Sequence, residues 1–160
     1  MIFSPAAREK TYFNIIYMNL QLFLIPIIVM FLIQVSKVLF YKGPWDWYRL
    51  KRINNYGGMP SSHSAMVTSL VVSLGNYYGL QTPSFAVAVI LALITIRDAY
   101  GFRQAIGKQG AVINQLVKEL PDDREYQFPI LGEKFGHKTI EVIVGVIIGI
   151  IFSYLLFPLF

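Results

Sequence analysis

Long uncharged stretches, mostly apolar, alternate with polar loops along this chain. No Asp, Glu, Lys or Arg occurs between Lys10 and Lys37, between Arg52 and Arg97, or after Glu141. A helix needs roughly 20 apolar residues to cross a bilayer. The first and last stretches therefore each predict one membrane-spanning helix.

The middle stretch is long enough for two shorter spans. Gly79–Pro83 would supply the turn between them, because glycine and proline interrupt helices and the residue before proline avoids the helical conformation. The sequence thus predicts one all-α domain over residues 1–160, an integral membrane bundle of about four transmembrane helices. The expected spans are Asn14–Phe40, Ser61–Gly79, Pro83–Gly101 and Thr139–Phe157.

A different pattern occupies Gln104–Leu120, between the third and fourth spans. Apolar residues recur there near helical spacing, while the intervening positions are polar. This pattern predicts one amphipathic helix that lies along the membrane interface or caps the bundle.

Composition agrees with a membrane protein. Hydrophobic residues make up 55% of the chain and charged residues only 14%, with a mean hydropathy of +0.52, whereas a soluble domain carries about a quarter charged residues. The absence of cysteine excludes disulfide and thiol chemistry. The net charge of +5 is typical of basic loops beside anionic lipid, so a nucleic acid partner is not expected.

Basic residues are concentrated in two loops, one between the first two spans and one between the last two. The positive-inside rule places both loops in the cytoplasm and both termini outside, as in a multi-pass protein of the cell membrane. The second and fourth spans then begin on the cytoplasmic face. A site formed by the starts of these two helices would therefore face the cytoplasm.

Both of these helix starts carry a histidine. His63 lies in the Gly57–Ala65 segment, and His137 follows Gly136 just before the last span. A helix N-terminus offers unpaired N–H donors and partial positive charge, which suit a phosphate group. Lys37, Arg97 and Asp98 end the first and third spans on the same face. The pattern predicts a phosphate site.

Two histidines can share phosphoryl transfer, one attacking phosphorus and the other protonating the leaving group and then activating water. Glu141 follows His137 by four residues, one helical turn, and is the expected orienting carboxylate. A zinc or manganese site of His63, His137, Glu141 and Asp98 is the alternative use of these ligands. The surrounding cations disfavour it, and a phosphohistidine mechanism requires neither metal nor cofactor.

Four motifs resemble the type 2 phosphatidic acid phosphatase superfamily, which includes the vanadium-dependent haloperoxidases, and look closest to its small divergent membrane branch. The resemblance covers most of the chain, from the first of these motifs to the last. The motifs are Q-V-S-K over Gln34–Lys37, G-G-M-P-S-S-H-S-A over Gly57–Ala65, D-A-Y-G-F-R-Q-A-I-G-K-Q over Asp98–Gln109, and G-H-x-x-x-E-V-x-x-G over Gly136–Gly145.

The resemblance implies a membrane lipid phosphatase that hydrolyses a phosphomonoester or pyrophosphate of a lipid through a phosphohistidine. His137 would be the nucleophile, Glu141 its orienting carboxylate and His63 the general acid. Ser61, Ser62 and backbone amides would bind the phosphate, together with Lys37.

The chain departs from the superfamily pattern at three positions. The arginine that precedes the proline of the first motif is missing before Pro44, and Leu131 stands six residues before His137 where another arginine is usual. The carboxylate is glutamate rather than aspartate. Arg103 is the expected substitute for one arginine, with Lys108 and Arg97 as further candidates.

Less specific interpretations remain open for several of these residues. Lys37 is also typical of a lysine that extends to the membrane surface, and Arg97 and Asp98 are able to pair with each other. The missing arginines favour a second hypothesis, a non-catalytic membrane protein that binds or moves a phosphorylated lipid. A homo-oligomer is compatible with either hypothesis.

Overall fold

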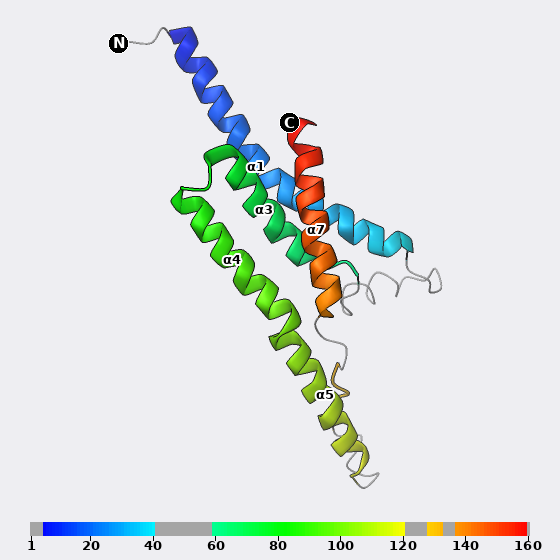
Figure 1. Ribbon diagram of the computed structural model, residues 1–160. Helices are drawn as coiled ribbons and strands as arrows, with labels where there is room; N and C mark the ends of the chain where they lie inside the picture. The colour runs from blue at the N-terminus through cyan, green and yellow to red at the C-terminus, as the bar shows by residue number, and fades with distance from the viewer. Residues whose placement is uncertain (1–4, 41–58, 121–127, 133–136, 160) are drawn as a thin grey trace.

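The computed structural model describes residues 5–40, 59–120, 128–132 and 137–159, with the side chains of the first helix from Leu20 onward (Figure 1). Every regular element among them is helical: α1 (Pro5–Phe40), α3 (Ser62–Tyr78), α4 (Pro83–Tyr100), α5 (Phe102–Lys118), α7 (Thr139–Leu156) and the short 3-10 helix η1 (Phe157–Leu159). The all-α prediction is confirmed. The expected second, third and fourth spans match α3, α4 and α7 to within one residue at each end.

A short turn joins α3 to α4 and is explained by local chemistry. Gly79 ends α3 with a φ of +83°, a conformation that glycine adopts without steric cost. Thr82 then caps α4, since its Oγ1 accepts the N–H of Phe85 at 3.4 Å. Pro83 occupies the first turn of α4, where its missing N–H costs nothing.

The central helix of the bundle is α3, which packs against α1, α4 and α7 (Figure 1). Three described stretches are long and apolar enough to cross a membrane, Leu20–Leu39, Pro83–Lys118 and Thr139–Leu159, and α3 is not among them. Hydropathy thus supports three of the four predicted spans. The reason is that α3 has 17 residues and many hydroxyls, which the surrounding helices shield from lipid.

Small residues bring α3 and α7 close together. A Cβ added at Gly145 would lie 2.5 Å from the carbonyl oxygen of Ser61, and one at Gly149 would lie 2.5 Å from that of Ala65. One turn further on, the hydroxyls of Ser153 and Ser69 are 2.7 Å apart. Such contacts are the usual basis of helix association in lipid, where no hydrophobic driving force acts between helices. Gly145 and Gly149, four residues apart on one face of α7, therefore allow the two helices to pack closely.

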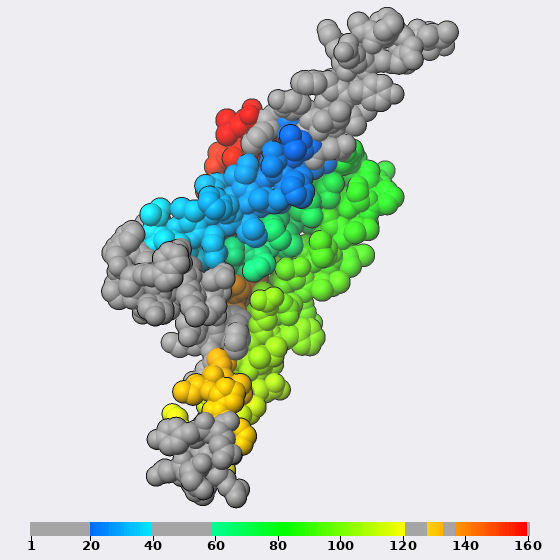
Figure 2. Space-filling view, turned by 180° about the vertical axis from the view of Figure 1, so that it is seen from behind, coloured from blue at the N-terminus to red at the C-terminus, as the bar shows by residue number. Residues whose placement is uncertain are grey.

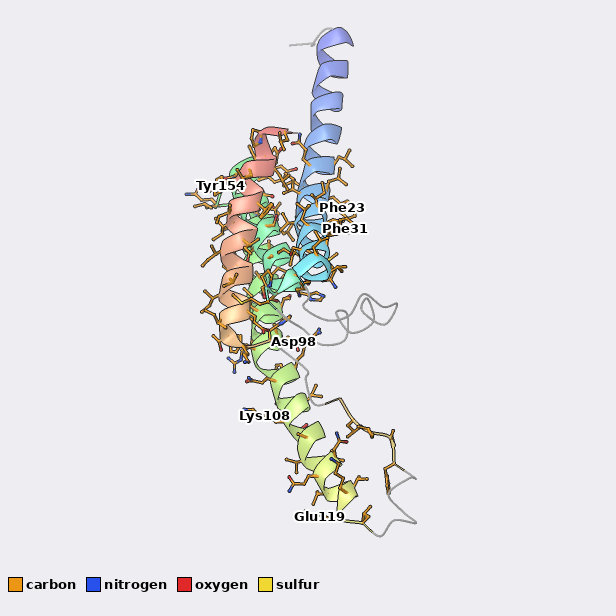
Figure 3. The ribbon with its side chains drawn as sticks, turned by 90° about the vertical axis from the view of Figure 1, so that its right-hand side faces the viewer. Phe23, Phe31, Asp98, Lys108, Glu119 and Tyr154 are labelled. Carbon is orange, nitrogen blue, oxygen red and sulfur yellow. The ribbon has the colours of Figure 1, made fainter. Side chains whose placement is uncertain are left out.

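The apolar core lies between α1, α3 and α7. Ile25, Val29 and Ile33 of α1 are buried against Ala65 of α3, and Ile148, Phe152 and Leu156 of α7 pack around them. By contrast, Phe23, Phe31 and Tyr154 point away from the bundle and are exposed (Figure 3). Large apolar side chains on the outer surface are what a lipid-facing bundle requires.

The amphipathic helix α5 continues the course of α4 instead of turning across the bundle (Figure 1). The N–H of Gly101 donates to the carbonyl of Arg97 at 2.9 Å, and that of Ala105 donates to Gly101 at 3.0 Å. The helix is nevertheless interrupted at Gly101, whose φ of −100° and ψ of −84° are not helical, and the carbonyl of Ala99 accepts the N–H of His137 instead of a helical partner. The amphipathic pattern is confirmed, and the interfacial location remains a prediction. The inner side of α5 packs against Leu131 and Gly132 of the segment 128–132, which lies beside the helix (Figure 2).

Candidate active site

The geometry of the site is clearest at His137 and Glu141. Nδ1 of His137 lies 3.0 Å from Oε2 of Glu141, and the His137 side chain is buried. The same oxygen accepts the N–H of Lys138 at 3.2 Å, which caps the start of α7. A carboxylate only accepts hydrogen bonds, so Nδ1 carries the proton and Nε2 keeps the lone pair. The contact predicted from the spacing is present.

Two backbone hydrogen bonds bring the ends of three helices to this pair. The N–H of His137 donates to the carbonyl of Ala99, in the last turn of α4, at 3.0 Å. The N–H of Ser61 donates to the carbonyl of Glu141, also at 3.0 Å. The starts of α3 and α7 therefore meet beside the end of α4, as the topology predicted.

The start of α3 provides amide donors. Ser61 is fully buried and caps the helix: its Oγ accepts the N–H of Ser64 at 3.4 Å and lies 2.9 Å from the Ser64 hydroxyl. The first amides of a helix have no acceptor within the helix. The backbone N–H groups of Ser62 and His63 donate no hydrogen bond within the described part of the chain, so they are available to an anion.

Two cations lie close enough to influence both imidazoles. The charges of Lys37, in the last turn of α1, and of Arg103, in the first turn of α5, act on His63 and on His137. Nε of Arg103 donates to Oδ2 of Asp98 at 2.7 Å. Asp98 thus pairs with Arg103 rather than with its neighbour Arg97 among the described side chains.

These surroundings lower the pKa of His137 below the ordinary value of 6.5. Burial is the largest cause, and the positive charges of Lys37 and Arg103 act in the same direction. The hydrogen bond that His137 donates to Glu141, and the negative charge of that carboxylate, oppose the shift. Neutral His137 is therefore the dominant form at pH 7, with a lone pair for nucleophilic attack.

The remaining candidates lie outside this cluster. Lys108 is exposed on α5, further from the bundle than Asp98 (Figure 3), and Arg97 is exposed near the end of α4. The charges that act on the two imidazoles come instead from Lys37, Arg103, Asp98 and Glu141. No group of three His, Asp or Glu side chains able to hold a metal ion occurs in the part of the chain that the structure describes.

One departure from the superfamily pattern has a structural counterpart. Leu131 is bound by its backbone to Asn114 of α5, with two hydrogen bonds of 2.8 and 2.9 Å, and so lies against α5 instead of the helix starts. Sequence reasoning missed Asn114, although a polar residue directly beside the apolar stripe of the helix was a signal. Pro44, Gly57, Gly58 and Gly136 fall outside the described residues.

Comparison with known proteins identifies the family of the chain. The model of the divergent PAP2 family matches residues 18–152. The chain belongs to the divergent PAP2 family. It is also similar to the uncharacterized membrane protein YuiD of Bacillus subtilis (strain 168), with 40% identity over 123 residues, which cover 69% of this chain and 75% of that protein. No solved structure matches the chain.

Membership confirms the resemblance inferred from the four motifs. With three helices apolar and long enough to cross a bilayer and a membrane protein among its relatives, this divergent PAP2 protein is an integral membrane protein.

Proposed function

We propose that this divergent PAP2 protein is a lipid phosphatase that hydrolyses a phosphomonoester or pyrophosphate through a phosphohistidine on His137. One observation carries the proposal: a buried imidazole, held at Nδ1 by Glu141 at 3.0 Å, lies where α3 and α7 begin and where Lys37 and Arg103 act on it. An oriented, neutral imidazole beside a cationic phosphate site is the arrangement that nucleophilic catalysis requires.

In the first step, Nε2 of His137 attacks phosphorus and the bond from phosphorus to the lipid oxygen breaks. His63, as imidazolium, gives its proton to the leaving oxygen. Neutral His63 then takes a proton from water, whose oxygen attacks phosphorus, and the bond between phosphorus and His137 breaks. Inorganic phosphate leaves, and both histidines return to their starting forms. Glu141 stabilises the positive charge that His137 carries between the two steps.

The transition state spreads negative charge over the phosphoryl oxygens, and fixed positive groups stabilise it without reorganisation. The amides of Ser62 and His63, the ammonium of Lys37 and the guanidinium of Arg103 are the groups we assign to this task. Nε of Arg103 is bound to Asp98, so the two Nη groups are the donors assigned to phosphate. Asp98 would then orient Arg103 and not bind phosphate itself.

A lipid substrate follows from the position of these groups at the ends of membrane helices. The phosphate would lie at the bilayer surface while the apolar chains remain in the membrane. We place the site on the cytoplasmic face, because the basic loops flank it. Phosphatidic acid and phosphatidylglycerol phosphate are substrates of the expected kind.

Purified protein assayed against a panel of lipid phosphates and pyrophosphates tests this function. We expect phosphate release from at least one lipid, its loss in His137→Ala, and a decrease of about 10²- to 10⁴-fold in His63→Ala. Lys118→Ala, an exposed change on α5, is the matched control and should retain activity. Vanadate, which mimics five-coordinate phosphorus, should inhibit. Unchanged release by His137→Ala would rule out the nucleophile assignment.

A second candidate is a non-catalytic protein that binds or moves a phosphorylated lipid. The observation that favours it is the 2.7 Å pairing of Arg103 with Asp98, which reduces the positive charge available to a transition state. In the same assay, tight binding of one lipid with no phosphate release from any would support this candidate over the phosphatase.

A further inference from the structure

The inner face of α5 holds the chain segment that leads to His137. Gly107, Gly110 and Asn114 are the buried residues of α5, and their spacing of three and four residues places them on one face. Nδ2 of Asn114 donates to the carbonyl of Leu131 at 2.8 Å, and its Oδ1 accepts the Leu131 N–H at 2.9 Å. One side-chain amide thus binds both polar groups of a single backbone residue.

Gly110 allows this segment to lie directly on the helix. A Cβ added at Gly110 would be 2.7 Å from the carbonyl oxygen of Gly132 and 3.6 Å from Cβ of Leu131. The first distance is too short for any real Cβ contact with a backbone atom. Asn114 and Gly110 are therefore two independent contributors to one attachment, which we call the α5 clamp.

The other end of the same segment is attached to α4. His137 donates its N–H to the carbonyl of Ala99, and α5 begins two residues after the end of α4, with Gly101 between them, and follows the same course (Figure 1). Ala99 lies in α4 and Gly110 in α5, and eleven residues of helical rise correspond to about 16 Å. The five residues from Gly132 to His137 reach at most about 17 Å. The clamp therefore sets an upper limit on how far His137 can move from its attachment to α5.

We propose that Asn114 is a positioning residue: with Gly110 it fixes the chain at Leu131 and Gly132 and so holds His137 in its buried place beside Glu141. This inference rests on the proposed function for its catalytic consequence, because a displaced His137 would be a poor nucleophile. Asn114 touches neither substrate nor reacting atoms, and its effect is carried entirely by the chain it binds.

Because the chain contains few histidines, a single substitution allows His137 to be observed alone. The chain has two, so in a His63→Gln background His137 is the sole imidazole. Diethylpyrocarbonate modifies neutral imidazoles, and both the rate of modification and its pH midpoint can be measured on protein in detergent without any enzymatic activity. Asn114→Ala and Gly110→Ala are compared in this background with Gln115→Ala, a matched control on an exposed part of α5.

We expect Asn114→Ala and Gly110→Ala each to raise the modification rate of His137 severalfold. The pH midpoint should move up towards the ordinary imidazole value of 6.5, because the burial that lowers it is lost. Asn114→Asp keeps an acceptor for the Leu131 N–H but loses the donor, so it should give an intermediate rate. Gln115→Ala should match the parent, and helical content by circular dichroism should be the same for all variants.

A rate and midpoint unchanged in both clamp variants would overturn the proposal, whether or not the protein hydrolyses lipid phosphates. When His63 is intact and the protein is an active enzyme, Asn114→Ala should lower kcat and leave KM nearly unchanged. If no lipid phosphate is hydrolysed but the modification results are as expected, the proposed function fails and the clamp stands.

Discussion

Glu141 performs two tasks with one carboxylate oxygen. Oε2 accepts from Nδ1 of His137 at 3.0 Å and from the N–H of Lys138 at 3.2 Å. The second contact caps α7 and is worth about 1 kcal/mol, while the first determines which nitrogen of His137 keeps its lone pair. Glutamine keeps an oxygen for the cap but not the negative charge, so the two tasks can be separated experimentally.

Glu141→Gln should fold normally and lose kcat by about 10²- to 10⁴-fold, because an amide can hold the imidazole in the wrong tautomer. The wild-type enzyme should lose activity as pH falls through the pKa of His137, which lies below 6.5. The Glu141 carboxylate raises that pKa, so its removal should shift the acid limb of the pH–rate profile to still lower pH. An acid limb that does not move would indicate that Glu141 acts only as a helix cap.

Among the elements, the pair α3 and α7 determines whether the site assembles. The helices approach most closely at Gly145 and Gly149, and the hydrogen bond from Ser61 to the Glu141 carbonyl joins their starts. A change that separates the helices should therefore lower both stability and activity.

Gly149→Ala places a Cβ 2.5 Å from the Ala65 carbonyl oxygen and 3.0 Å from its Cα, and backbone atoms cannot rotate aside. We expect a loss of about 1–3 kcal/mol, seen as a lower midpoint of thermal unfolding in detergent. Gly75→Ala is the matched control, since its Cβ would meet only side-chain atoms of Leu80 and Phe85 at 3.2 Å. Equal midpoints for the two variants would contradict the close packing of α3 and α7.

Sequence patterns predicted the elements better than their arrangement. Charge-free stretches, Gly79 and Pro83 located the last three spans, and the four-residue spacing of His137 and Glu141 predicted their contact. Apolar pattern did not predict the extension of α1 back to Pro5. It also missed that α5 follows the course of α4 (Figure 1), because an interruption at Gly101 is equally compatible with a turn across the bundle. The pairing of Arg103 with Asp98 and the binding of Leu131 by Asn114 depend on that course.

The molecule as a whole has two chemically different ends. The starts of α3 and α7 and the end of α4 lie together at one end, with Lys37 and Arg103 acting on the histidines there. The turn between α3 and α4 lies at the other end and contains no charged residue. If the protein follows the positive-inside rule, substrate phosphate reaches the site from the cytoplasm.

The absence of cysteine makes this orientation easy to test with single introduced cysteines. Gln81→Cys and Lys138→Cys both replace exposed residues, one in the α3–α4 turn and one beside the site. In intact cells a membrane-impermeant maleimide should label Gln81→Cys, and should label Lys138→Cys only after the membrane is opened. The reverse result would place the site outside and favour a substrate on the outer leaflet.

The most direct test of the account is to trap the covalent intermediate. Purified protein is mixed briefly with a lipid substrate labelled in its phosphate and quenched in alkali, in which phosphohistidine survives, and the labelled residue is identified by peptide mass spectrometry. We predict label on His137, abolished in His137→Ala and blocked by vanadate. Phosphate release without label on His137, or label on another residue, would contradict the assignment of His137 as the nucleophile.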